Sequence, residues 1–126
     1  MSIDLTICSV SYKQSKHILA NINLTKAINI TEKINWLIVD NAFEDKSFFD
    51  NIEDSDSNVK IFSGVPNNFN DPKKESKHHA AGLDLIVRKV KTRFILIIDP
   101  DFYVVMPNWI QRITSYALQN KPLAML

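Results

Sequence analysis

Two aspartates, Asp99 and Asp101, flank one proline directly after the apolar run at residues 94–98. Carboxylates at positions i and i+2 can converge on one cation if the chain bends between them, and Pro100 favours such a bend. Oxygen ligands of this kind suit Mg²⁺ or Mn²⁺ rather than zinc. Two carboxylates leave coordination positions open, so the motif predicts a metal-assisted site for a phosphate-bearing substrate. An ordinary turn with capping aspartates is the alternative interpretation.

Short apolar runs that lack a helical period predict the strands that would position these carboxylates. They lie at residues 5–10, 36–39, 59–62 and 94–98. A polar stretch with two proline steps predicts a loop at residues 63–76. The apolar residues 123–126 are expected to begin a fifth strand.

Four helices are expected between and after these strands. Ser15 is expected to cap the first and Ser76 the third, because serine is a favoured N-cap residue. The second is short, and the fourth has Pro107 at its first helical position. Their apolar faces comprise Ile18, Leu19 and Ile22; Phe48, Phe49 and Ile52; Leu83, Ile86, Val87 and Val90; and Trp109, Ile110, Ile113, Tyr116 and Ala117.

This order predicts an α/β fold in a single domain over residues 1–126. Strands that are apolar throughout, with helices between them, imply a mostly parallel sheet with helices on both faces. The abrupt apolar end leads us to expect a fragment of a longer domain, truncated as its fifth strand begins. A truncated sheet exposes an apolar edge, and we therefore expect self-association into a homo-oligomer.

Composition excludes several classes of protein. A net charge of +1 argues against a nucleic-acid partner, and no apolar stretch approaches the ~18 residues of a membrane span. With only two glycines, Gly64 and Gly82, the chain has neither a dinucleotide fingerprint nor a P-loop. The single cysteine, Cys8, lies in an apolar run and cannot form an intrachain disulfide. We expect a cytoplasmic protein, reaching a membrane face only through partners or a further segment.

Polar residues follow three of the predicted strands, at the edge where ligands bind in open parallel sheets. In chain order these are Ser11 and Tyr12, Asp40 and Asn41, and Asp99 and Asp101. His79 lies near the start of the third expected helix, whose N-terminus could receive an anion. The alternative for this histidine is a solvated first turn.

Three segments give the sequence a resemblance to a known family. They are LTICSVSYKQ at the start, NWLIVDNAFEDKS at the second strand, and SKHHAAGLDLIVRKVKTRFILIIDPDFYVVMPNWI around the aspartate pair. On these segments the chain resembles the amino-terminal, nucleotide-binding half of family 2 glycosyltransferases of the GT-A type. The resemblance implies metal-dependent, inverting transfer of a sugar from a UDP-, GDP- or dTDP-sugar to a saccharide or other hydroxyl acceptor.

The resemblance also assigns the nucleotide-binding residues. Ser11 and Tyr12 would pack on the nucleotide, and Asp40 would hydrogen-bond its base beside Asn41. His79 would belong to the same nucleotide-sugar site. The chain departs from the family after the second strand, where the usual serine and glycine are missing around Asp45. The resemblance therefore leaves the donor sugar undefined.

The metal would be held at the Asp-Pro-Asp motif by the same resemblance. Asp99 would lie near the ribose and the metal, and Asp101 would bind the Mn²⁺ or Mg²⁺ ion directly. The family's catalytic base comes from an acceptor-binding half, and no residue of this chain can be assigned that role.

Two other functions compete with the enzyme. A receiver-like regulatory domain has a similar length, but it would need acidic residues after the first strand, where Ser9 and Ser11 stand. The second competitor is a degenerate glycosyltransferase fold that serves as a non-catalytic binding or oligomer-forming module.

Overall fold

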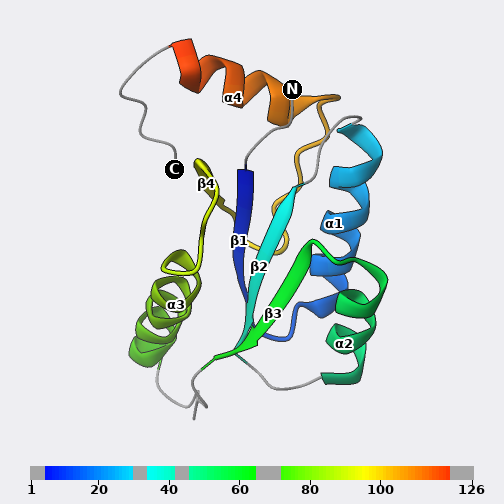
Figure 1. Ribbon diagram of the computed structural model, residues 1–126. Helices are drawn as coiled ribbons and strands as arrows, with labels where there is room; N and C mark the ends of the chain where they lie inside the picture. Colours follow the sequence, from blue (N-terminus) through cyan, green and yellow to red (C-terminus); the bar gives the residue numbers. More distant parts are fainter. Residues whose placement is uncertain (1–4, 30–33, 42–45, 65–71, 120–126) are drawn as a thin grey trace.

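The computed structural model describes residues 5–29, 34–41, 46–64 and 72–119, and it alternates strands with helices throughout (Figure 1). In chain order the elements are β1 (Leu5–Ser11), α1 (Ser15–Ile28), β2 (Asn35–Asp40), α2 (Lys46–Ser55), β3 (Val59–Ser63), α3 (Pro72–Val87), β4 (Phe94–Ile97) and α4 (Trp109–Gln119). The four predicted strands are confirmed to within a residue or so at their ends. The fifth strand, expected at residues 123–126, lies outside the described residues.

The four strands form one parallel sheet in the order β3-β2-β1-β4. The chain winds outward from β1 to β3 and then crosses back to place β4 on the other side of β1. This order differs from the 2-1-3-4-5 order of receiver-like domains, so that alternative is wrong. Because the winding reverses between β1 and β4, their carboxyl ends border the crevice where ligands bind in such sheets.

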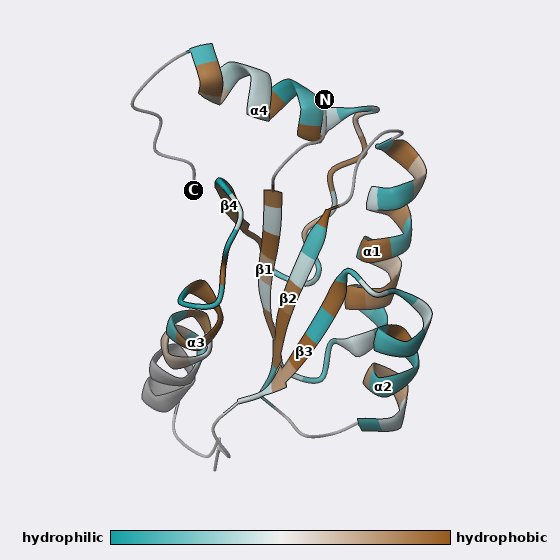
Figure 2. Cartoon of the chain, in the orientation of Figure 1, coloured by the Kyte–Doolittle hydropathy of each residue, from teal (hydrophilic) through white to brown (hydrophobic). Residues whose placement is uncertain are grey.

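Helices cover both faces of the sheet, as predicted. Figure 1 shows α1 and α2 on one side and α3 on the other. The larger core cluster joins Ile7 and Trp36 of the sheet to Ile18 of α1, and a smaller one joins Val39 to Ile86 of α3. In Figure 2 the central strands are mainly hydrophobic, whereas hydrophilic residues predominate along α2. The alternation of side chains along each strand thus supplies both cores.

Three helix starts differ from the sequence-based expectations. Ser15 is the first residue of α1 rather than its cap, because the first helical hydrogen bond joins Ile18 N to Gln14 O at 3.0 Å. The third helix, α3, begins at Pro72, four residues before the expected cap Ser76. Proline suits a first helical position, which explains why the predicted loop ends early. Residues 65–71 of that loop lie outside the described residues.

Pro107 is not the first residue of α4, which begins two residues later at Trp109. The intervening Asn108 has a left-handed φ of 57°, and its N–H donates to Ile28 O at 2.7 Å. This hydrogen bond joins the chain to the end of α1, and α4 begins only at the next residue. None of the helices in the described ranges is long and apolar enough to cross a membrane.

Cys8 provides a test of the sheet. It lies on β1, between β2 and β4 in the sheet, and its fully buried side chain belongs to the core cluster that includes Ile86 of α3. Burial raises the pKa of the thiol to about 11. We expect no reaction with a thiol reagent near pH 8 in the native protein, because the reactive thiolate is suppressed and inaccessible. Stoichiometric labelling should follow unfolding in urea. Rapid labelling of the native protein would contradict the position of β1. The Cys8→Ser variant, which has no thiol, is the control for labelling of other groups.

Candidate functional site

A tight turn carries the two aspartates away from β4. The N–H of Phe102 donates to Asp99 O at 3.0 Å, and Pro100 occupies the second position, which proline favours in such turns. The chain therefore bends between Asp99 and Asp101, as predicted. Both aspartates are exposed, so their carboxylates remain available to a ligand.

The sheet fixes the start of this turn from the neighbouring strand. Ile98 N donates to Cys8 O at 3.1 Å, which continues the β1–β4 ladder by one residue. The buried hydroxyl of Ser9 donates to Ile98 O at 2.8 Å. Both backbone groups of the residue before Asp99 are thus held by β1.

Helix α1 fixes the other end of the turn through a buried amide. Asn21 Nδ2 donates to Phe102 O at 2.7 Å and lies 3.4 Å from Pro100 O. Just after the last residue of α1, Asn29 Oδ1 accepts a hydrogen bond from Ile110 N at 3.1 Å. We call Asn21, Thr25 and Asn29 the polar stripe of α1, since they lie four residues apart and all are buried.

None of these three residues was predicted to belong to the site. Asn21, Thr25 and Asn29 follow an i, i+4, i+8 spacing beside the apolar face of α1, and that spacing was the available signal. Members of the stripe also bond to one another, because Asn29 Nδ2 donates to Thr25 O at 2.8 Å. Of the three, Asn21 and Asn29 also bond to backbone atoms of residues 100–110.

A hollow of about 310 Å³ lies at the carboxyl ends of β1 and β4. Val10, Tyr12, Gln14, Asn41, His79, Asp99, Pro100 and Asp101 line it. The structure thus brings together five of the predicted site residues. His79 Nε2 is 3.8 Å from Asp99 Oδ1, so the histidine faces the aspartate that starts the turn. Gln14 also lines the hollow and was missed, since nothing in its local sequence marks it.

Ser11 and Asp40, the other two predicted site residues, do not line this hollow. They are paired in the β1–β2 register, and both are buried. Asn41 N donates to Ser11 O at 2.8 Å, and Gly64 N donates to Asp40 O at 2.9 Å. These hydrogen bonds hold together the ends of β1, β2 and β3, so both residues support the strand ends next to Tyr12 and Asn41.

Gly64 has a steric role next to Asn41. A Cβ atom at this position would lie 1.8 Å from Asn41 Oδ1, which no ordinary contact allows. Glycine therefore permits the close approach of the chain after β3 to a residue that lines the hollow.

The carboxylates of Asp99 and Asp101 suit a divalent cation that takes most of its ligands from water and substrate. No group of three or more His, Cys, Asp or Glu side chains within the described ranges is placed to hold a metal. Asp99 and Asp101 alone suit Mg²⁺ or Mn²⁺, which commonly bind one or two carboxylates together with water and substrate phosphates. The residues present fit such an ion once a phosphate ligand accompanies it.

Neither a protein-family model nor a curated protein matches this sequence. Solved structures do match its fold. S. aureus TarS 1–349 aligns with a TM-score of 0.69 and 14% identity, over 93% of this chain and 33% of that one. Its complex with UDP gives a TM-score of 0.66, 15% identity and coverages of 93% and 32%. The mannosyltransferase PcManGT from Pyrobaculum calidifontis, in complex with GDP-Man and Mn²⁺, aligns with a TM-score of 0.70 and 10% identity. The alignment covers 93% of this chain and 33% of that one.

This chain has a GT-A-like glycosyltransferase fold. It spans about a third of the length of the solved structures that it matches. The fold implied by the resemblance is therefore confirmed. At these identities the comparison concerns the fold alone.

Asn21→Leu tests the contact between α1 and the turn. We expect the free energy of unfolding to fall by about 1–3 kcal/mol, because two backbone carbonyls lose their buried donor. Asn23→Leu, at an exposed position of the same helix, is the matched control and should change it by no more than about 0.5 kcal/mol. Urea denaturation measures both. Equal effects would contradict the assigned role of Asn21.

Proposed function

We propose that this chain forms the donor-binding part of a metal-dependent, inverting glycosyltransferase. The observation that carries the proposal is the convergence of Tyr12, Asn41, His79, Asp99 and Asp101 on one hollow. These residues come from four segments of the chain and meet beside the reversal point of the sheet. A nucleotide-sugar placed there would have its diphosphate close to the two exposed carboxylates.

The nucleoside would be recognised at the ends of β1 and β2. Tyr12 offers an aromatic ring for stacking, and Asn41 offers an amide that can both donate and accept hydrogen bonds. Lys13 Nζ lies 5.4 Å from the centroid of the Tyr12 ring, which places a cation near the bound nucleotide. Ser11 and Asp40 are buried at the ends of β1 and β2 and would support these groups, while Tyr12 and Asn41 contact the nucleoside.

The diphosphate would be recognised at the Asp-Pro-Asp turn. Asp99 and Asp101 would hold Mn²⁺ or Mg²⁺, which when bound stabilises the negative charge of a departing diphosphate. His79 would orient Asp99, since its Nε2 is 3.8 Å from that carboxylate. The hydrogen bonds from Ser9 and Asn21 keep the turn in place before the donor arrives, which reduces the cost of ordering it.

The transfer itself is a direct displacement at the anomeric carbon. The acceptor hydroxyl forms the new glycosidic bond as the bond to the nucleoside diphosphate breaks, and a base takes the hydroxyl proton. We assign no described residue to this base. Support for a donor of this kind comes from two solved structures of the same fold, one in complex with UDP and one with GDP-Man and Mn²⁺.

A non-catalytic binding module with the same fold is the second candidate. The lack of an assignable base among the described residues favours it. Metal-dependent binding of a nucleotide favours the first candidate, whereas a folded protein that binds no nucleotide favours the binding or oligomer-forming module.

Calorimetric titration of UDP, GDP and dTDP, with and without Mn²⁺, tests the donor site. We expect one nucleotide to bind only when Mn²⁺ is present, because the carboxylates otherwise repel the diphosphate. Asp101→Asn should weaken this binding at least about tenfold, or ~1.4 kcal/mol. Asp54→Asn, an exposed aspartate on α2, is the matched control and should bind like the unsubstituted protein. A folded protein that binds none of the three nucleotides would contradict the proposal.

A further inference from the structure

Lys13, in the turn from β1 to α1, has a backbone conformation that lysine rarely adopts. Its φ is 57°, in the left-handed region, where the side chain of an L-residue crowds its own backbone. Among the described residues other than glycine, only Asn108 shares this conformation, and asparagine tolerates it better than lysine does. Because strain of this kind is concentrated at functional sites, we expect the lysine side chain to have a specific use here.

The side chain of Lys13 lies against the aromatic ring of the residue before it. Lys13 Nζ is 5.4 Å from the centroid of the Tyr12 ring, within the range of a cation–π attraction. Tyr12 and Gln14 both line the hollow of the candidate site, whereas Lys13 between them does not. The ammonium group therefore meets the ring from outside the hollow, and the ring stays accessible from within it.

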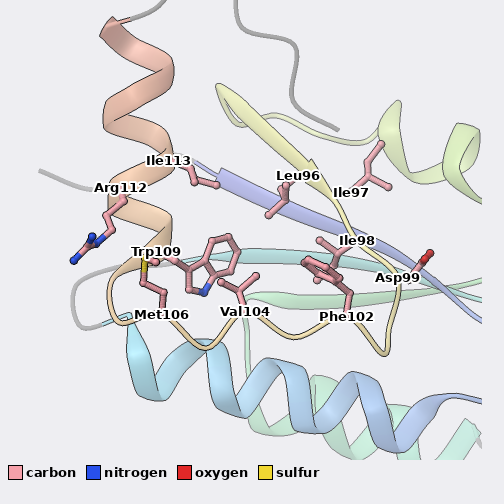
Figure 3. Close-up of a pocket in the computed structure, with 10 residues that line it drawn as sticks. All are labelled: Leu96, Ile97, Ile98, Asp99, Phe102, Val104, Met106, Trp109, Arg112 and Ile113. Carbon is pink, nitrogen blue, oxygen red and sulfur yellow. The ribbon is translucent and has the colours of Figure 1, made fainter.

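The hollow offers carboxylates from one segment and an aromatic ring from another. Asp99 and Asp101 follow β4, whereas Tyr12 follows β1. Figure 3 shows Asp99 pointing away from Val104 and Trp109, which leaves its carboxylate to the polar hollow. A metal ion and a diphosphate require the carboxylates, so the ring is left for the flat base of the same ligand.

We propose that Lys13 is a positioning residue that holds the Tyr12 ring in place for stacking on the base of a nucleotide. This inference rests on the proposed donor site. The ammonium group attracts the ring from outside, and the base would stack on the part of the ring that is open to the hollow. A ring that is ordered before the ligand arrives loses less conformational entropy on binding. Lys13 would thus raise the affinity for the nucleotide without touching it.

Removal of the charge tests this role, with whichever of UDP, GDP and dTDP binds in the presence of Mn²⁺. Lys13→Met should raise the dissociation constant about two- to fivefold, because methionine keeps much of the length but lacks the cation. Lys13→Arg should stay within about twofold, since a guanidinium group also packs on a tyrosine ring. Lys16→Met, an exposed lysine on α1, is the matched control and should leave the constant unchanged. Calorimetric titration measures all four proteins.

A Tyr12→Leu background separates positioning of the ring from direct contact with the phosphates. If Lys13 acts through the ring, Lys13→Met should have no further effect once the ring is absent. An equal loss of affinity in both backgrounds would assign the ammonium group to the diphosphate and would overturn the proposal.

Lys13→Asn separates a role in binding from a role in folding. Asparagine suits the left-handed φ but carries no charge, so this variant should weaken nucleotide binding as Lys13→Met does, with no fall in melting temperature. A loss of affinity that occurs only together with a lower melting temperature would contradict a positioning role.

The failure of this inference is distinguishable from the failure of the donor site. Equal affinity for one nucleotide with lysine, methionine or asparagine at position 13 would overturn the inference and leave the donor site standing. A folded protein that binds none of the three nucleotides would contradict both.

Discussion

The buried amide of Asn21 is the interaction on which the candidate site depends. It donates to the carbonyls of the turn that carries Asp99 and Asp101, and it does so from a helix packed against the sheet. Carbonyl groups in such a place need a donor, and water cannot easily supply one. Tyr103 adds a second tether, since its hydroxyl lies 2.7 Å from His17 Nδ1 on the same helix. The two aspartates are therefore exposed on a turn that hydrogen bonds to α1 hold in place.

Sheet topology brings the remaining groups to this support. Because β4 returns to the far side of β1, the turn after β4 lies next to Tyr12, which follows β1. The register pairs Ser11 with Asp40, so that Asn41, the next residue after Asp40, lies near Tyr12 at the end of β1. Gly64 allows the chain after β3 to pass close to the Asn41 side chain. The strand order therefore brings an aromatic ring, an amide and two carboxylates to the turn that Asn21 holds.

Much of this architecture was predictable because the strands are apolar on both faces. A run such as 36–39 is apolar at every position, which is typical of a strand in a buried parallel sheet. The proline of the Asp-Pro-Asp motif favours a bend in the chain. The helix starts were less predictable, because Pro72 and Asn108 respond to contacts that sequence spacing does not record. The role of Asn21 was hidden for the same reason, since its partners are backbone atoms about 80 residues away along the chain.

Paramagnetic broadening by Mn²⁺ in NMR spectra tests the central claim most directly. With UDP, GDP or dTDP present in turn, one nucleotide should allow Mn²⁺ to broaden the amide signals of Tyr12, His79 and Asp101 together. Without nucleotide the broadening should be much weaker, and Asp101→Asn should remove it. Broadening that centres on α2, or that ignores the nucleotide, would contradict a donor site at the Asp-Pro-Asp turn.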